Sequence, residues 1–155
     1  HPRLNAALID NAVHQYSSIN LGVAIDIEAG LGVPVLRDAE KLSLTQIAAE
    51  VRVLADKART GSLEPADFQN GTFTVSNLGG LGVDWFTPVL NPPQAAILGV
   101  GRIRSAPVVA GGEVEVGQIA TLVVTFDHRV IDGAPCARFL TDLKALIESP
   151  EALTT

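Results

Sequence analysis

The sequence has little cysteine, few aromatic residues and no long apolar run. These shortages argue against an internal disulfide, a core built from aromatic side chains and a membrane-spanning helix. Only one residue of 155 is cysteine, Cys136, so no disulfide can form within the chain, as is typical of proteins from reducing compartments. Aromatic residues make up 5% of a chain that is 47% hydrophobic, so aliphatic side chains must build the core. No apolar run reaches the roughly 18 residues of a membrane-spanning helix, and the first residues lack a signal-peptide pattern. We therefore expect no membrane partner.

Positive charge and metal-ligand patterns are also scarce. The chain has 11 Lys and Arg against 17 Asp and Glu, which gives a formal net charge of −6. Proteins that bind nucleic acids usually carry a basic surface, so we expect no nucleic-acid partner. No CxxC or HxxxH pattern occurs, and one histidine near carboxylates is a poor ligand set, so we expect no metal site.

The apolar periodicity predicts a mixture of strands and two helices. A helix should begin at Ser43, where "SLTQ" has the form of a capping box, and end at Gly61. Asp132 should cap a final helix with Pro135 in its first turn and with an apolar face of Cys136, Phe139, Leu140, Leu143 and Ile147. Strands are predicted over 19–28, 33–38, 71–77, 95–103 and 118–126, with a turn at "AGLG" after the first and a hairpin over 107–116 near Gly111 and Gly112.

This order of elements is typical of an α+β fold, a mixed β-sheet covered by helices, in one domain. Residues 4–13 fit either the end of a helix or a strand. The segment 78–94 is rich in Gly and Pro and too long for a simple turn, which indicates a binding loop or an interface loop.

One histidine lies at the end of a predicted strand, a position where catalytic residues are often found. In "TFDHRVIDG" (125–133), His128 follows an apolar strand and is flanked by charge. An imidazole there can serve as a general base, or it can be a hydrogen-bonded structural histidine. Asp132 can cap the helix, orient nearby charges, or do both. Arg129 can pair with Asp127 or with Asp132.

Three other features have a structural interpretation beside a functional one. Cys136 can be a nucleophile, but its place on the apolar face of the last helix favours a buried packing thiol. "NLGGLG" (77–82) is similar to a phosphate loop, yet no helix with Lys-Ser/Thr follows it. "ADKA" (55–58) contains the triplet that surrounds a lipoylated lysine, but a helical Lys57 is more typical of a surface lysine.

Four blocks together resemble one family. "FDHRVIDGAPCARFL" is similar to the signature of the C-terminal catalytic domain of dihydrolipoyl acyltransferases, the E2 subunits of 2-oxo acid dehydrogenase complexes. "INLGVAIDIEAGLGVPVLRD", "GTFTVSNLGGLG" and "NPPQAAILGVGRI" resemble further segments of that family in the same order. The resemblance implies a chloramphenicol-acetyltransferase-like α+β sandwich. Residues 1–155 would then form a partial catalytic domain without the lipoyl and peripheral-subunit-binding domains.

The resemblance also implies a mechanism. His128 would be the general base that takes the proton from the thiol of coenzyme A, and Ser76 would donate a hydrogen bond to the oxyanion. Asp132 would orient the histidine loop, and Asn77 and Asn91 would contact substrate. The acyl group, acetyl or branched-chain, would move between coenzyme A and a lipoyl group carried on a separate domain, and no metal would take part.

The family resemblance predicts partners as well. A homotrimer would form the active site at its subunit interfaces, with His128 facing Ser76 of a neighbouring chain, and a larger cubic or icosahedral core would follow. The end "ESPEALTT" has one leucine where the family commonly has several, which also leaves a lone trimer open. Other partners would be the E1 and E3 components and the lipoyl domain, in the bacterial cytoplasm or the mitochondrial matrix.

Two other functions fit the same fold. One is a small-molecule O-acetyltransferase that acts on an acceptor such as chloramphenicol, against which "SNLGGLG" and "NPPQAAILGVG" argue. The other is a non-catalytic core protein that only scaffolds the complex. The joint presence of His128, Asp132 and Ser76 argues against the scaffold.

Overall fold

The structure is a computed structural model that describes residues 1–28 and 30–153. The two helices in this part of the chain are α1 (Leu44–Arg59) and α2 (Gly133–Glu148). The strands there are β1 (Ala6–Ile9), β2 (Ala12–Gln15), β3 (Leu21–Ile27), β4 (Gly30–Gly32), β5 (Val35–Leu36), β6 (Phe73–Asn77), β7 (Ala96–Val100), β8 (Arg104–Ala110), β9 (Glu113–Ile119) and β10 (Leu122–Phe126). Short 3-10 turns occupy Pro2–Leu4, Ala39–Lys41, Pro65–Phe68, Gly79–Leu81 and Pro150–Leu153.

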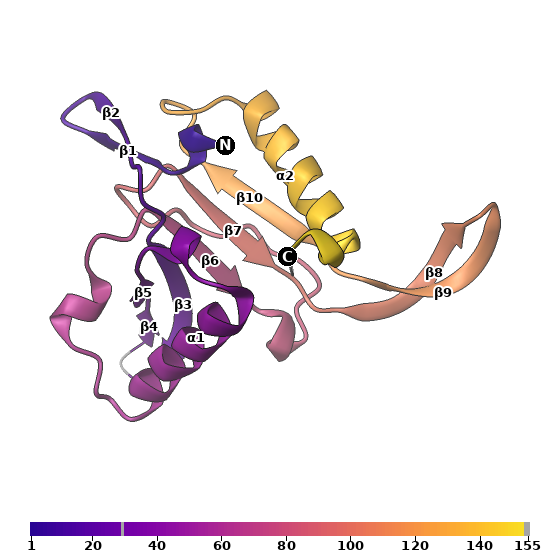
Figure 1. Cartoon of the computed structure of the whole chain (residues 1–155), viewed down its shortest axis with the longest axis horizontal. Coiled ribbons are helices and arrows are strands. Elements are labelled where there is room, and N and C mark those ends of the chain that lie inside the picture. Colours follow the sequence, from indigo (N-terminus) through magenta and orange to yellow (C-terminus); the bar gives the residue numbers. More distant parts are fainter. Residues whose placement is uncertain (29, 154–155) are drawn as a thin grey trace.

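A mixed sheet forms the centre of the molecule (Figure 1). Its strand order is β10-β7-β6-β3-β4, and β5 also pairs with β3. β3, β6 and β7 run parallel to one another, whereas β10, β4 and β5 pair antiparallel. Two separate hairpins, β1–β2 and β8–β9, extend from this body, and the second projects far from it in Figure 1. The predicted α+β mixture is therefore what the structure shows.

The capping box predicted at the start of α1 is confirmed. The Ser43 hydroxyl accepts a hydrogen bond from the Gln46 backbone N–H at 3.3 Å, and the Gln46 side chain accepts one from the Ser43 N–H at 2.8 Å. Two N–H groups that the helix leaves without partners are thereby satisfied. The helix ends at Arg59, just before Gly61 with its φ of 66°, and Leu54 and Ala58 are its buried residues.

The start of α2 differs from the expectation. Asp132 occupies the N-cap position, but its side chain makes no cap hydrogen bond, because the carboxylate points instead toward His128. Cys136 is buried, and Phe139 packs beside it against Leu4 and Ile131. Ile147, predicted on the apolar face, is 54% exposed in this chain, so the burial of α2 is strongest in its first half.

Several strand boundaries were wrong. The predicted turn at "AGLG" contains β4, which pairs with β3 through Gly30–Gly32, and the predicted strand 33–38 shortens to β5. The predicted strand 118–126 is two strands, because the hairpin runs from Arg104 to Ile119 and the chain then enters β10. The undecided segment 4–13 contains β1 and the start of β2, which pair antiparallel.

The two faces of the sheet have different covers. Both helices lie on one face in Figure 1, and Phe73 of β6 points to that face, where its ring meets the ring of Phe139. Neighbouring residues of a strand point to opposite faces, so Thr74 and Ser76 point to the helix-free face. The segment between β6 and β7 covers that second face, since Phe86 and Pro88 approach Gly99 of β7.

Glycine 101 allows this segment to cross the end of β7. A Cβ placed on Gly101 would lie 1.9 Å from the backbone carbonyl oxygen of Asp84, a contact that no side chain could tolerate. The Arg102 N–H donates to the Val83 carbonyl at 2.8 Å, and the Arg102 guanidinium pairs with the Asp84 carboxylate. The crossing point is thus held by backbone and side-chain bonds together.

We expect Gly101→Ala to destabilise the fold by about 1–3 kcal/mol, because the backbone must move to admit the methyl group. Gly80→Ala is the matched control, since a Cβ there has no atom within 4 Å and its φ is not positive. Urea denaturation of both variants measures the difference. Equal unfolding free energies for the two variants would contradict the close approach at Gly101.

Candidate active site

The loop from Asp127 to Asp132 carries the predicted base and is fixed at both ends. At its start, the Asp127 N–H donates to the Ala95 carbonyl at 2.8 Å, and the Asp127 carbonyl accepts from the N–H groups of Val130 and Ile131. At its end, Ile131 is 2% exposed in the core. These contacts fix the backbone of the loop that carries His128.

A charged clamp adds to this rigidity. The Arg129 backbone N–H donates to the Asp127 carboxylate at 2.9 Å, and the Arg129 guanidinium donates at 2.6 Å. Of the two partners left open for Arg129, the structure selects Asp127. The guanidinium bond, with the backbone N–H second, lowers the pKa of the Asp127 carboxyl below its usual value.

His128 and Asp132 come together on the outer side of the loop. The His128 Nδ1 and an Asp132 carboxylate oxygen are 3.5 Å apart, and both side chains are more than 70% exposed. The imidazole also lies against the Phe126 ring, with the ring centroids 5.5 Å apart. Since Nδ1 faces the carboxylate, Nε2 is the nitrogen that remains for a substrate proton.

Ser76 stands in a row of small residues that crosses three strands. Its register partners are Ala24 on β3 and Gly99 on β7. Two residues earlier in each strand, Thr74 lies beside Gly22, where an added Cβ would come within 2.8 Å of the Thr74 hydroxyl oxygen. Phe86 and Pro88 fill the place of a side chain at Gly99, and Ser76 lines an open space beside them on the helix-free side of the sheet.

This space is a cavity of about 410 Å³. The floor is formed by the sheet, with Ser76 and Ile97, and the walls come from Val33 and from the segment between β6 and β7, with Phe86 and Leu90. The residues that line it are Ala24, Leu31, Val33, Thr74, Ser76, Phe86, Thr87, Pro88, Val89, Leu90, Asn91 and Ile97. We call it the Ser76 cavity.

A buried polar chain supports one wall of the Ser76 cavity. The Thr74 hydroxyl donates to the Gln94 side-chain carbonyl at 2.6 Å, and the Asn91 amide donates to the Thr74 oxygen at 3.4 Å. Sequence reasoning missed Thr74 and Gln94, although a glutamine directly before the apolar run "AAILGV" is a signal of a buried polar contact.

The predicted site residues thus fall into two groups and one outlier. Ser76 and Asn91 line the same cavity, and His128 and Asp132 share the exposed loop. Asn77 lines neither place; its side-chain oxygen accepts from the Gly79 N–H at 2.8 Å and so fixes the turn after β6. A substrate contact of Asn77 stays a prediction.

One chain does not bring His128 to Ser76. Ser76 pairs with Gly99 near the carboxyl end of β7, whereas Phe126, two residues before His128, pairs with Ala96 at the amino end of that strand. Residues along a strand are about 3.3 Å apart, so the two side chains leave opposite ends of the sheet. His128 accordingly does not line the Ser76 cavity.

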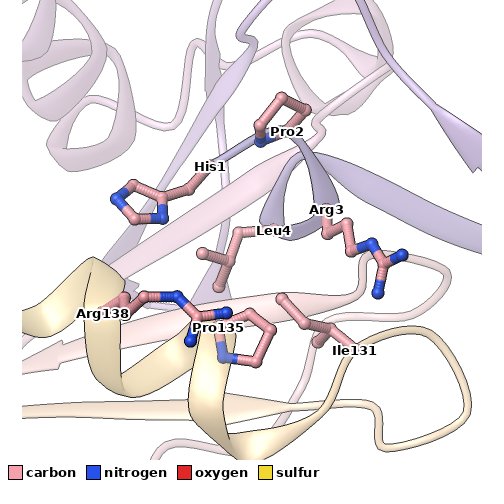
Figure 2. Close-up of a pocket in the computed structure, with 7 residues that line it drawn as sticks. All are labelled: His1, Pro2, Arg3, Leu4, Ile131, Pro135 and Arg138. Atoms are coloured by element: carbon pink, nitrogen blue, oxygen red, sulfur yellow. The ribbon is translucent and has the colours of Figure 1, made fainter.

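A second pocket lies on the core side of the histidine loop. Figure 2 shows it between the first residues of the chain and the start of α2, with Ile131, Pro135 and Arg138 opposite Arg3 and Leu4. Its volume is about 440 Å³, and none of the predicted site residues lines it.

Cys136 lies buried in the first turn of α2. Burial, and then the charge of Asp132, raise the pKa of the Cys136 thiol, which makes it a poor nucleophile and a good packing group. Residues 1–28 and 30–153 contain no group of three His, Cys, Asp or Glu side chains that could hold a metal ion. None of the helices in these ranges is long and apolar enough to cross a membrane.

Comparison with known proteins then identifies the family. A family model described as the 2-oxoacid dehydrogenases acyltransferase catalytic domain matches residues 1–155. The chain belongs to this acyltransferase family. The α+β fold expected from the resemblance is confirmed, since the dihydrolipoamide acetyltransferase of Azotobacter vinelandii aligns with a TM-score of 0.94 and 38% identity over 99% of this chain.

Two relatives of this member of the acyltransferase family belong to different enzyme systems. The acetyltransferase component of the acetoin cleaving system of Bacillus subtilis is 44% identical over 99% of the chain. Component 2 of the mitochondrial pyruvate dehydrogenase complex acetyltransferase of Arabidopsis thaliana is 44% identical over 98%. The chain spans only 38% and 29% of these two relatives, and 64% of the Azotobacter chain.

Crystallographic and enzymatic work on the Azotobacter enzyme concerns the role of one serine, one histidine and one asparagine in its catalytic mechanism. In that enzyme the asparagine follows the histidine at the same interval as Asp132 follows His128 here, and the serine precedes the histidine at the Ser76-to-His128 interval.

We expect Asp127→Asn to destabilise the acyltransferase fold at neutral pH, because the variant loses a charged pair with Arg129. The Arg129 side chain is 73% exposed, so solvent screens the pair and we expect a loss of about 0.2–1 kcal/mol. Since the pKa of Asp127 is lowered on folding, this stability is present above the unfolded pKa of about 4 and is lost as the pH falls below it.

Urea denaturation between pH 7 and pH 3 measures this prediction. The difference between parent and Asp127→Asn should shrink as the solution becomes acidic. Glu50→Gln, an exposed position on α1 with the same loss of charge, is the control. A difference that is constant with pH, or equal to that of the control, would argue against the clamp.

Proposed function

We propose that this chain is part of a dihydrolipoyllysine-residue acyltransferase that moves an acyl group between dihydrolipoamide and coenzyme A within a 2-oxo acid dehydrogenase complex. The observation that carries the proposal is the spacing of three residues along the chain. Ser76, His128 and Asp132 repeat the serine, histidine and asparagine intervals of the Azotobacter enzyme; Ser76 lines a cavity, and His128 and Asp132 lie exposed on their loop.

The residues have complementary chemical roles in such a transfer. His128 Nε2 accepts the proton of the coenzyme A thiol, and the thiolate attacks the carbonyl carbon of the acyl-dihydrolipoamide thioester. The carbonyl oxygen becomes an oxyanion that accepts a hydrogen bond from the Ser76 hydroxyl. The bond to the lipoyl sulfur then breaks, and that sulfur takes the proton back from His128, which leaves acyl-coenzyme A and a free dihydrolipoyl thiol.

Asp132 is where this chain departs from the Azotobacter enzyme. An aspartate in place of the asparagine adds a negative charge 3.5 Å from the His128 Nδ1. A carboxylate there can accept a hydrogen bond from the Nδ1–H and so favours the tautomer with a free Nε2. We assign Asp132 a positioning role on this ground.

A site shared between subunits follows from the separation of the two groups. Because His128 and Ser76 leave opposite ends of one sheet, a working pair requires His128 of one chain and Ser76 of another. We therefore propose a homotrimer, as in the expectation from the family resemblance. The projecting β8–β9 hairpin offers a surface for such packing, with Val109, Val114 and Val116 each at least 74% exposed.

The wider partners follow from the same assignment. The lipoyl domain would deliver the acyl group, the E1 component would load it, and the E3 component would reoxidise the dihydrolipoyl thiols. Relatives from a bacterium and from a plant mitochondrial complex support a place in the bacterial cytoplasm or the mitochondrial matrix. A larger cubic or icosahedral core built from trimers completes the proposal.

The first test measures acetyl transfer from acetyl-dihydrolipoamide to coenzyme A by the full-length protein. We expect Ser76→Ala to lower kcat by about 100- to 1000-fold, since it removes one oxyanion donor. His128→Ala should lower it by about 100- to 10,000-fold, since it removes the base. His14→Ala, an exposed histidine on β2, is the control and should keep the parental rate.

The alternative functions give other outcomes. A scaffold would assemble and bind lipoyl domains without turnover in the parent protein. An O-acetyltransferase would use acetyl-coenzyme A to modify chloramphenicol and would not accept dihydrolipoamide. A His128→Ala variant as fast as the parent would remove His128 as the base.

Mixed assemblies test whether the site spans two chains. His128→Ala and Ser76→Ala proteins are each unfolded, mixed in equal amounts and refolded together. If one site takes His128 and Ser76 from different chains, roughly a quarter of the interfaces in random mixed trimers contain both native residues. We therefore expect activity to return to about a quarter of the parental value.

A doubly substituted protein mixed with parent under the same conditions controls for refolding yield. If both residues acted within one chain, no mixture of the two single variants would contain a native site, and activity would stay at the level of the variants.

A further inference from the structure

We infer that Phe126 is a positioning residue for the acyl transfer: its ring supports one side of the His128 imidazole and so fixes the direction of Nε2. The inference rests on the proposed function, in which Nε2 takes the proton of the coenzyme A thiol. It gives a part in the reaction to a residue of β10 that otherwise belongs to the core.

The Phe126 ring is held from within the fold. Phe126 is the last residue of β10 and is half-buried, and its side chain packs against a cluster of buried residues. These are Leu4, Ala96, Ile131 and Cys136. The tip of the ring reaches the start of α2, since a Cβ added to Gly133 would lie 4.0 Å from Phe126 Cζ. Contacts from separate parts of the chain thus fix the place of the ring.

The turn after β10 brings His128 onto this ring. The Asp127 carbonyl accepts hydrogen bonds from the N–H groups of Val130 and Ile131, which turns the chain directly after the strand. The imidazole and the Phe126 ring then meet with their centroids 5.5 Å apart and their planes inclined at 43°. Interacting aromatic rings lie about 4.5–7 Å apart, so one side of the imidazole is covered by a ring that the core holds.

The polar neighbours of His128 do not orient its ring by themselves. The Asp132 oxygen lies 3.5 Å from Nδ1, which is longer than the roughly 2.7–3.2 Å of a well-formed N–H···O hydrogen bond. The Arg129 guanidinium is engaged with the Asp127 carboxylate. An attraction at one ring nitrogen leaves the tilt of the ring open, so the direction of Nε2 needs a second contact, and Phe126 supplies it.

This support comes from the same chain as the histidine. In the proposed trimer, a second chain would bring Ser76 to His128 from the substrate side. Phe126 instead lies on the core side of the imidazole, because its own side chain packs into the core of the chain that carries His128. Every copy of His128 therefore has the same support, whatever the neighbouring chain adds.

The direction of Nε2 matters because proton transfer depends on geometry. The nitrogen must lie within hydrogen-bond reach of the thiol from which it takes the proton. A displacement of about 1 Å at a reacting atom can cost about 100-fold in rate. Without the Phe126 ring, Nε2 would take several directions, of which only one is productive.

The test measures acetyl transfer from acetyl-dihydrolipoamide to coenzyme A by the assembled full-length protein. We expect Phe126→Leu to lower kcat at least about tenfold, because the base loses its orientation. The KM for each substrate should stay within about twofold, because no substrate contact is removed. Phe126→Tyr keeps the ring, and Gly133 has no side chain to meet the added hydroxyl, so this variant should restore most of the rate.

Phe139→Leu is the matched control. Phe139 packs against the same buried cluster, but its ring contacts the rings of Phe73 and His1 rather than that of His128. The control thus removes an identical ring from the same core and should keep the parental kcat. Urea denaturation of the two leucine variants compares the stability that each has lost, and so separates positioning from general damage to the core.

A double-mutant cycle shows whether Phe126 acts through His128. His128→Ala protein has no imidazole to orient, so adding Phe126→Leu should leave its residual rate unchanged. In Ser76→Ala protein the same change should again cost at least about tenfold. Crystal structures of the assembled parent and Phe126→Leu proteins show the imidazole without turnover, and we expect one ring orientation in the parent and several in the variant.

The outcomes separate this inference from the proposed function. Parental kcat in folded Phe126→Leu protein, or a loss no larger than that of Phe139→Leu, overturns the positioning role while the acyltransferase function stands. An equal loss in the His128→Ala background, or a single unchanged imidazole orientation in the crystals, overturns it as well. If Phe126→Leu does not fold, Phe126→Met takes its place, because methionine adapts to irregular core space without a ring. Absence of transfer by the parent overturns the proposed function, and the inference with it.

Discussion

The parallel pairing of β3, β6 and β7 is the constraint on which the rest of the site depends. Its register places Ser76 between Ala24 and Gly99 and thereby fixes both the direction of the serine hydroxyl and the space in front of it. A register slip of one residue would turn Ser76 toward the helices. The same register sets Gly99 under Phe86 and Pro88, so the strand pairing also determines where the covering segment lies.

Polar interactions hold the two ends of the site, and they do so in different ways. Near Ser76 the bonds among Thr74, Gln94 and Asn91 lie in or beside the core, where an unsatisfied partner would be costly. At the histidine loop the clamp between Asp127 and Arg129 lies near solvent, and the buried Ile131 supplies the anchor. The cavity is therefore fixed by burial, whereas His128, the proposed base, is fixed by a short loop with a charged pair at one end and an apolar side chain at the other.

The sequence predicts much of the fold, for identifiable reasons. The capping box at Ser43 and the apolar stripe after it are local signals, and α1 follows them closely. The boundaries that failed depend on pairing with distant residues: β4 forms because β3 offers it an edge, although Gly30 and Gly32 read as turn residues. Asp132 was predicted to cap α2 because the local sequence has the pattern of a helix start. That pattern does not show that the Asp132 carboxylate lies toward His128 instead.

The sequence predicts which residues belong to the candidate site better than it predicts how they are arranged in space. His128, Ser76 and Asp132 could be named from motifs, whereas the Ser76 cavity joins side chains of β3, β4, β6 and β7 with Val33 and the loop before β7, which only the folded sheet brings together. The separation of His128 from Ser76 is likewise a property of sheet topology: β10 runs antiparallel to β7, so it delivers its loop to the end away from Ser76. If His128 is the base and Ser76 the oxyanion donor, as we propose, a fold that holds them apart within one chain makes catalysis depend on association. Any change that weakens subunit contact would then lower activity even where every catalytic side chain is intact.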